Sequence, residues 1–117
     1  MLRSHTCGEL RADAVGQTVT LCGWVDTYRD HGGTLFVDLR DRYGLTQVVF
    51  EPSAGQELMD VAGQLRAEWV ISVTGTVAHR PAGTVKIERK DGTRVETGEI
   101  EVRVSKLEVL NKCPTPP

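Results

Sequence analysis

Aromatic residues are scarce in this chain: two Trp, two Tyr and two Phe make up 5% of its 117 residues. A general binder of single-stranded nucleic acid stacks successive bases on exposed aromatic rings, and this composition disfavours that class. Positive charge is not in excess either, since 14 Lys and Arg stand against 16 Asp and Glu. The balance argues against a protein that relies on phosphate attraction alone. Any nucleic-acid binding must therefore rest on base contacts and a local basic patch.

Cysteines are few, and their spacing suits neither cross-links nor metal. Cys7, Cys22 and Cys113 are odd in number and contain no C-x-x-C pair. This pattern indicates neither a disulfide framework nor a zinc site, and a reducing cytosol is the simplest setting. The first six residues have no apolar signal-peptide core, and no run approaches membrane-spanning length. We therefore expect a cytoplasmic protein without membrane contact.

Motifs of catalysis are also missing. The chain has no Gly-x-x-x-x-Gly-Lys-Ser/Thr phosphate loop, no Gly-x-Ser-x-Gly elbow and no His-Glu-x-x-His pair. The acidic stretch 38–41 could imitate a pair of catalytic carboxylates. Arg40 and Arg42 are interleaved with these acids, so ion pairs and turn hydrogen bonds explain them more simply. We expect no catalytic residue and no metal site in this chain.

Short apolar alternations separated by glycine and proline predict a β-rich fold. Gly23 inside the first predicted strand indicates a bulge or bend. One helical stripe follows Ser53, a candidate N-cap. Strands are predicted at residues 18–29, 34–41, 45–51, 69–79 and 98–110, and the helix at 54–66. This order is that of the all-β, five-stranded OB-fold Greek-key barrel with one helix between strands three and four; another small β-barrel or an α+β domain is the alternative.

A basic segment separates the last two predicted strands. Residues 86–96 read as a charged hairpin with an Asp-Gly turn, and their cations are Lys86, Arg89, Lys90 and Arg94. After this come the last strand and a proline-rich tail. We assign residues 1–112 to the domain and 113–117 to a stiff linker.

Four residues of the predicted strands have chemistry suited to unpaired bases. Phe36 is predicted to point away from the core, where it can stack on a base; alternatively it covers the barrel edge or packs under residues 81–97. Gln47 faces the same way, and its amide can both donate to and accept from a base edge. Arg29 can grip a phosphate or stack on a base. Glu101 can accept N–H donors of guanine. The alternative for Gln47 and Glu101 is an ordinary solvated surface.

The sequence resembles the N-terminal anticodon-binding domain of bacterial-type aspartyl-tRNA synthetases. The resemblance rests on VTLCGWV (19–25), RDHGG (29–33) and FVDLRDRYGLTQVVF (36–50), with further matches at 65–71, 75–77, 97–102 and 110–117. It covers essentially the whole chain in the right order, and it implies an OB fold that binds the anticodon loop of aspartate tRNA.

The resemblance also implies roles for individual residues. Phe36 would stack on an anticodon base, Gln47 would read the central uracil, and Glu101 would recognise the first-position guanine or its modified form. Arg29 would hold the loop, and Arg80 would contact RNA from the end of the fourth strand. The family's catalytic domain, with its ATP and magnesium, is expected outside this chain, so no cofactor is expected here. The full-length parent is expected to be a homodimer, with Trp24 or Trp69 near the interface.

Two departures from the family pattern bear on binding strength. Thr27-Tyr28-Arg29 stands where the family often has three arginines. The loop before residue 97 is also lengthened into the basic hairpin, and we hypothesise that Lys86, Arg89 and their basic neighbours compensate by touching the RNA backbone. A histidine at position 31 resembles the family members that also accept asparagine tRNA. A general single-strand binder and a structural or protein-binding barrel remain the alternatives.

Overall fold

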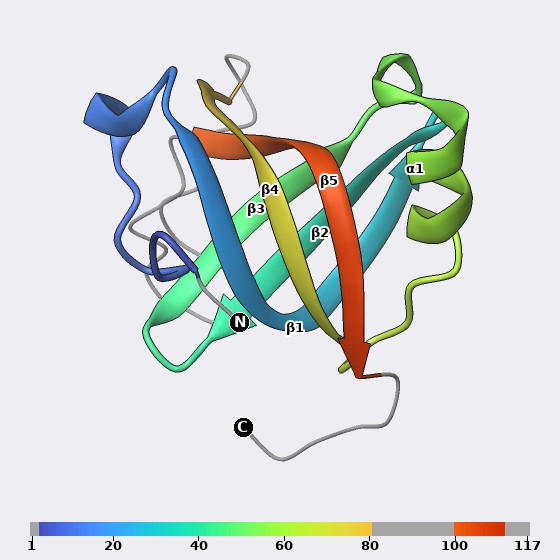
Figure 1. Ribbon diagram of the computed structural model, residues 1–117, viewed down its shortest axis with the longest axis horizontal. Coiled ribbons are helices and arrows are strands. Elements are labelled where there is room, and N and C mark those ends of the chain that lie inside the picture. Colours follow the sequence, from blue (N-terminus) through green and yellow to red (C-terminus); the bar gives the residue numbers. More distant parts are fainter. Residues whose placement is uncertain (1–2, 81–99, 112–117) are drawn as a thin grey trace.

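The computed structural model describes residues 3–80 and 100–111. Its five strands close into a barrel in the order β1-β2-β3-β5-β4, and β1 curves strongly enough to pair with both β2 and β4 (Figure 1). The elements are η1 (Ala12–Ala14), β1 (Thr18–His31), β2 (Thr34–Asp41), β3 (Gly44–Phe50), η2 (Pro52–Ala54), α1 (Gln56–Ala62), β4 (Val70–His79) and β5 (Ile100–Asn111).

The strand connections explain why the barrel closes. β1 to β3 form an antiparallel meander. The chain then passes through α1 to β4, which pairs with β1, while β5 joins β4 to the free edge of β3 by a parallel pairing. Closure leaves no open sheet edge among these strands. The predicted five-stranded barrel with its helix between the third and fourth strands is confirmed.

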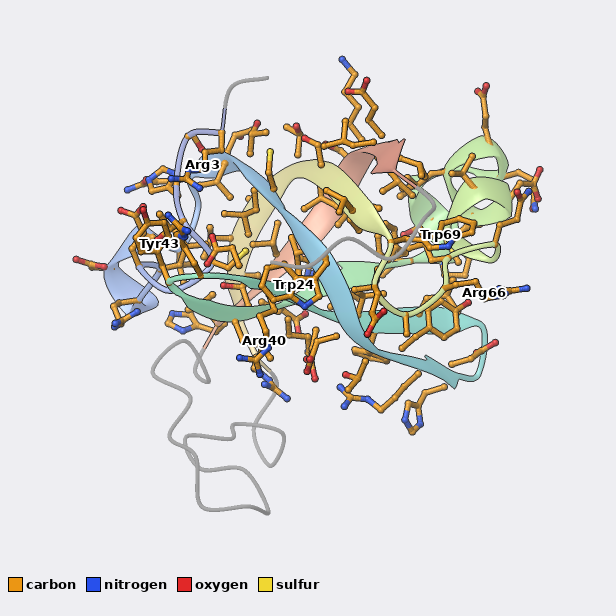
Figure 2. The ribbon with its side chains drawn as sticks, turned by 90° about the horizontal axis from the view of Figure 1, so that it is seen from below. Arg3, Trp24, Arg40, Tyr43, Arg66 and Trp69 are labelled. Carbon is orange, nitrogen blue, oxygen red and sulfur yellow. The ribbon has the colours of Figure 1, made fainter. Side chains whose placement is uncertain are left out.

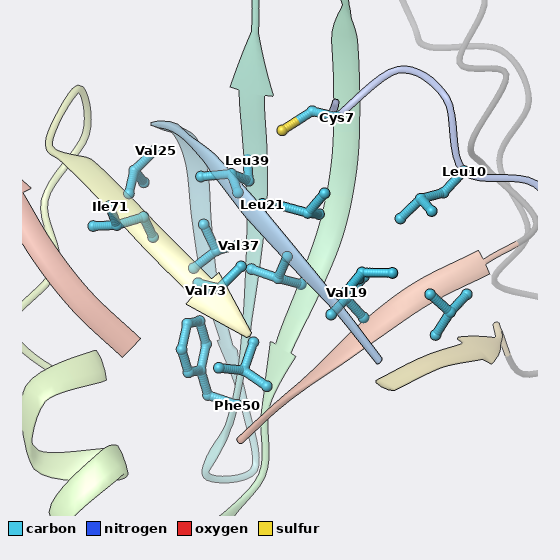
Figure 3. Packing of buried hydrophobic residues seen from close by; sticks show 14 of the residues in the cluster. Cys7, Leu10, Val19, Leu21, Val25, Val37, Leu39, Phe50, Ile71 and Val73 are labelled. Carbon is cyan, nitrogen blue, oxygen red and sulfur yellow. The ribbon is translucent and has the colours of Figure 1, made fainter. Parts of the chain in front are cut away.

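Alternate residues of every strand fill the barrel. In β2, Leu35, Val37 and Leu39 are buried, while Phe36 and the other intervening residues are less so. Figure 3 shows Val37 and Leu39 among inward side chains of the neighbouring strands, together with the fully buried Phe50. The burial of the inner row leaves the other row of each strand on the outside of the barrel. In β2 this outer row is partly exposed, whereas in β3 the outer residues Gln47 and Val49 are covered as well.

The predicted helix is longer than the observed one. Pro52 opens a 3-10 turn, and Gly55, at φ 125°, separates that turn from α1. Ser53 lies inside the turn, so its assignment as the N-cap is wrong. α1 ends at Ala62: Gly63 still donates to the Met59 carbonyl four residues back, but the next N–H groups, of Gln64 and Leu65, donate to carbonyls only three residues back, and the chain then turns toward β4. The apolar stripe is nonetheless partly real, since Ala62 and Leu65 are buried.

A glycine is required at position 23 for a reason other than the expected bulge. The register shift in β1 falls between Val25 and Thr27 rather than at Gly23. A Cβ on Gly23 would lie 2.3 Å from the Arg40 carbonyl oxygen. The glycine therefore permits close approach of β1 and β2, and the bulge lies three residues further on.

Asp41 ties the β2–β3 turn to the N-terminal segment. Its Oδ1 accepts from the backbone N–H groups of Tyr43 and Gly44 at 2.8 and 3.1 Å, and its Oδ2 accepts from the Cys7 N–H at 2.9 Å. This carboxylate therefore has a structural role, as the sequence indicated for the acids of 38–41. Among the described residues, no helix is long and apolar enough to cross a membrane.

Candidate nucleic-acid interface

The register of the barrel arranges outward side chains in rows that cross several strands. Directly paired residues point to the same side of a sheet. One row runs across β1, β2, β3 and β5 through Arg29, Phe36, Val49 and Arg103. The next contains Thr27, Asp38 and Gln47. On β5, Glu101 is two residues from Arg103 and thus on the same face. We call this surface the outer face.

Three side chains of the outer face form a continuous hydrogen-bonded array. The Arg29 Nη2 donates to the Gln47 Oε1 at 3.1 Å. The Gln47 Nε2 in turn donates to the Glu101 Oε1 at 3.2 Å. β1, β3 and β5 each supply one member, so residues 72 positions apart in sequence are joined through a single amide. The structure thereby brings together three of the residues singled out in the sequence.

The array continues on its β5 side. The Arg103 Nε lies 3.5 Å from the second carboxylate oxygen of Glu101 and 3.6 Å from the Glu51 Oε1. The Glu101 side chain is only 5% exposed, and a buried carboxylate is costly without donors. Gln47 supplies a hydrogen bond to this carboxylate, and Arg103 supplies a compensating positive charge. Arg103 escaped the sequence reasoning, although its two-residue spacing from Glu101 in a predicted strand could have revealed it.

On its β1 side the array is anchored by Asp38. The Thr27 Oγ1 donates to the Asp38 Oδ2 at 2.6 Å, and the Arg29 Nη1 lies 3.8 Å from the same oxygen. Thr27 thus takes up a structural hydrogen bond at one of the positions where the family often has arginine. Tyr28, its neighbour, packs against the core, and burial raises the pKa of its hydroxyl, with Asp30 adding to the effect. Packing, rather than an exposed aromatic contact, is therefore its observed role.

Phe36 lies beside this array on β2, between Arg29 and Val49 in the register. It is half-buried rather than enclosed in the core. The His31 ring meets it edge-on, with the ring centroids 5.7 Å apart and the planes at 77°. His31 precedes the Gly32-Gly33 turn, whose positive φ angles of 61° and 91° suit a tight hairpin. The hairpin thus places an imidazole against the edge of a candidate stacking ring.

Arg80 follows β4, two residues after Ala78, which pairs with Glu101. Burial lowers the pKa of its guanidinium, opposed by the nearby carboxylates of Asp38 and Glu101. An arginine nonetheless stays protonated in proteins. Its Nε is buried and has no hydrogen-bond partner among the described residues. A buried donor without a partner is unfavourable, so this N–H is available to an acceptor that a ligand brings.

Burial separates the two interpretations offered for Gln47 and Glu101. Both residues are only 4% exposed. The alternative that they form an ordinary solvated surface is therefore wrong. Polar groups that are hydrogen-bonded to neighbouring side chains and so little exposed hold their orientation, which is what recognition of a base edge requires.

Lys86 and Arg89, together with the rest of the predicted hairpin and the tail at 113–117, lie outside the described residues. The domain boundary at 112, the RNA-backbone contacts of the hairpin and the placement of Phe36 under residues 81–97 therefore stay predictions. Another described cation, Arg40, pairs outside the array, since its Nε lies 3.3 Å from the Asp26 Oδ1.

The remaining aromatic residues lie apart from the array. Figure 2 shows Tyr43 beside Arg3 at one end of the molecule, with the Arg3 guanidinium 5.3 Å from the centre of the Tyr43 ring. Trp24 pairs in register with Arg40 on β1 and β2, and Trp69 lies next to Arg66 on the other side of the barrel (Figure 2). Cys7 is buried, and burial is the main cause that raises the pKa of its thiol, so this cysteine is unreactive.

Comparison with protein families decides which kind of barrel this is. The family of tRNA anticodon domains described as "OB-fold nucleic acid binding domain" matches residues 19–110. The chain belongs to this family. The matched range contains all of the barrel except the first residue of β1 and the last residue of β5, and it includes the whole array of Arg29, Gln47 and Glu101.

Curated relatives narrow the type of anticodon domain. The chain is 54% identical over 117 residues to the aspartate–tRNA(Asp/Asn) ligase of Desulfatibacillum aliphaticivorans, and 59% identical over 115 residues to that of Salinibacter ruber. The alignments cover 100% and 98% of this chain but 19% and 17% of those ligases. The domain is thus an anticodon-binding OB domain of the aspartyl-tRNA synthetase type, and it spans about a fifth of the relatives' length.

Solved structures share the fold. Asparaginyl-tRNA synthetase from Pyrococcus horikoshii matches with a TM-score of 0.72 and 30% identity, over 92% of this chain and 23% of that one. An OBody bound to hen egg-white lysozyme, AM3L09, matches with a TM-score of 0.77 and 26% identity, over 97% of this chain and 99% of that one. The same barrel therefore occurs in a tRNA synthetase and in a free-standing protein binder.

Proposed function

We propose that the outer face reads the anticodon loop of aspartate tRNA. The observation that supports this most strongly is the Arg29–Gln47–Glu101 array beside Phe36. It offers a flat ring for stacking, an amide for a base edge and a buried carboxylate for N–H donors. Single-stranded RNA is recognised through such stacking and edge contacts.

Each residue of the array has one role in this proposal. Phe36 stacks on an anticodon base, with His31 holding the edge of its ring. Gln47 pairs with the central uracil through one donor and one acceptor. Glu101 accepts from the first-position guanine or its modified form. Arg29 contacts the RNA loop and at the same time keeps its hydrogen bond to Gln47, because a guanidinium has five N–H donors.

Binding requires the outer face to open. Gln47 and Glu101 are 4% exposed, whereas the side chains of Arg29 and Arg103 are 42% and 54% exposed. The ends of the long cationic side chains are therefore the parts that shift when a base enters, while Arg29 keeps its hydrogen bond to Gln47. Arg80, whose buried Nε has no partner within the described part of the chain, contributes a donor to the incoming RNA. In this proposal Lys86 and Arg89, from the segment between β4 and β5, add contacts to the RNA backbone.

Asparagine tRNA is the second partner that we propose. The relatives from Desulfatibacillum aliphaticivorans and Salinibacter ruber are both named as ligases for tRNA(Asp/Asn). His31 follows Asp30 in the hairpin. The family resemblance associates a histidine at this position with acceptance of both aspartate and asparagine tRNA. We further propose that the whole protein is an ATP- and magnesium-dependent aspartate–tRNA ligase, homodimeric and cytoplasmic, whose catalytic domain lies outside this chain.

The experiment is a fluorescence titration of the domain with anticodon stem-loops. A loop carrying guanine-uracil-cytosine should bind about 5- to 150-fold more tightly than the same loop with cytosine at the centre, since a matched edge contributes about 1–3 kcal/mol. The asparagine stem-loop should bind nearly as tightly as the aspartate one. Equal affinity for the uracil and cytosine loops would contradict base reading and leave a general single-strand binder. No binding to either loop would leave a protein-binding barrel.

A further inference from the structure

Gln47 has a chemical ambiguity that the array resolves. Uracil presents the acceptor O4 next to the donor N3–H, whereas cytosine presents a donor amino group next to the acceptor N3. A glutamine amide fits uracil in one orientation and fits cytosine after a half-turn about its last side-chain bond. With the base ring held in one orientation by its backbone and by stacking, a glutamine that is free to turn therefore cannot separate the two pyrimidines.

The neighbours of Gln47 permit only one of these orientations. Arg29 has donors and no acceptors, and it contacts the Oε1. Glu101 as a carboxylate has acceptors and no donors, and it contacts the Nε2. A turned amide would set N–H against guanidinium and oxygen against carboxylate. Both contacts would become repulsive, so the orientation follows from the chemistry of the two partners.

The array also leaves Gln47 the correct groups for a base. An amide carries two N–H donors and two acceptor lone pairs. Arg29 occupies one lone pair and Glu101 one donor. One donor and one acceptor remain, which is the set that uracil needs.

We infer that Arg29 and Glu101 are positioning residues that set the choice of uracil over cytosine by holding the Gln47 amide in one orientation. Arg103 supports this arrangement, because it contacts the second oxygen of the Glu101 carboxylate. Since Glu101 also faces the first anticodon base in the proposed function, reading of the first and second bases is coupled. The inference rests on the proposed function and adds the source of its specificity.

The test measures a ratio: the dissociation constant for the central-cytosine loop divided by that for the central-uracil loop, with the other bases constant. R29Q replaces a side chain that only donates hydrogen bonds, and E101Q replaces one that only accepts them. The new amide can do both in each case. Each should lower the ratio by up to about tenfold, though not below one, and the double variant should bring it close to one. R29K keeps a side chain that only donates, so it should retain the ratio even where overall affinity falls.

Arg40→Gln is the matched control, because it removes one positive charge from β2 at a residue that pairs with Asp26 instead of Gln47. Its ratio should equal that of the wild type. Thermal unfolding followed by circular dichroism verifies that each variant folds. A double variant that keeps the wild-type ratio, or an R29K ratio as low as that of R29Q, overturns the inference and leaves the proposed function intact. A wild-type ratio of one instead contradicts the proposed function itself.

Discussion

Phe36→Ala is expected to weaken binding of the aspartate anticodon stem-loop by about 1–3 kcal/mol, or about 5- to 150-fold in the dissociation constant. The reason is the loss of a stacking surface on the outer face, next to Arg29 in the register. Stability should change little, because Phe36 is only half-buried and lies outside the core cluster. Isothermal calorimetry gives the affinity, and thermal unfolding gives the stability.

Tyr43→Ala is the matched control for this prediction. Tyr43 is the most exposed large apolar residue described, at 56%. It lies in the turn after Asp41, the end of β2, which is itself about 17 Å from Phe36 at strand spacing. Its removal should leave RNA affinity unchanged. Phe36→Tyr should keep most of the affinity, since a phenol ring also stacks. Equal losses in the Phe36→Ala and Tyr43→Ala variants, or none in the former, would assign Phe36 a structural role.

Phe50→Ala is expected to destabilise the domain by about 3–5 kcal/mol. Phe50 is fully buried at the end of β3, opposite Leu35 in the register and within the core shown in Figure 3. Removing the ring leaves a cavity that the closed barrel can fill only in part. Since small domains have total stabilities of about 5–15 kcal/mol, this is a large share. Urea denaturation should show a lower midpoint with an unchanged slope.

Phe50→Leu retains most of the apolar volume and should cost less than the alanine variant. A loss below about 1 kcal/mol for Phe50→Ala, the range typical of surface positions, would contradict the placement of Phe50 in the core. The outcome matters for function as well. β3 carries both Phe50 inside and Gln47 outside, so the packing of this strand sets the position of the amide.

Much of the fold could be predicted because strand periodicity is local. The alternation in β2 separates Leu35, Val37 and Leu39 from Phe36 and Asp38, and the structure places them as that pattern indicated. The helix was overestimated because an apolar stripe continues after the backbone has left the helix at Ala62. Side-chain spacing alone does not reveal where backbone hydrogen bonds cease.

The candidate site was predictable residue by residue but not as a network. Each of Arg29, Gln47 and Glu101 has a side chain suited to RNA, and that much is visible in the sequence. Their mutual hydrogen bonds depend on the pairing of β3 with β5, which brings together positions more than fifty residues apart. Burial of Gln47 and Glu101 likewise follows from barrel closure, which no local pattern encodes.

The account's central claim is that the outer face of β1, β2, β3 and β5 contacts the anticodon bases. Amide and side-chain chemical shifts of the labelled domain, followed by NMR as the aspartate stem-loop is added, test this claim most directly. We expect the largest changes at Arg29, Phe36, Gln47 and Glu101, including the side-chain amide of Gln47, and little change at Tyr43. Changes centred on Tyr43 and Arg3, with the Gln47 amide unaffected, would contradict the account.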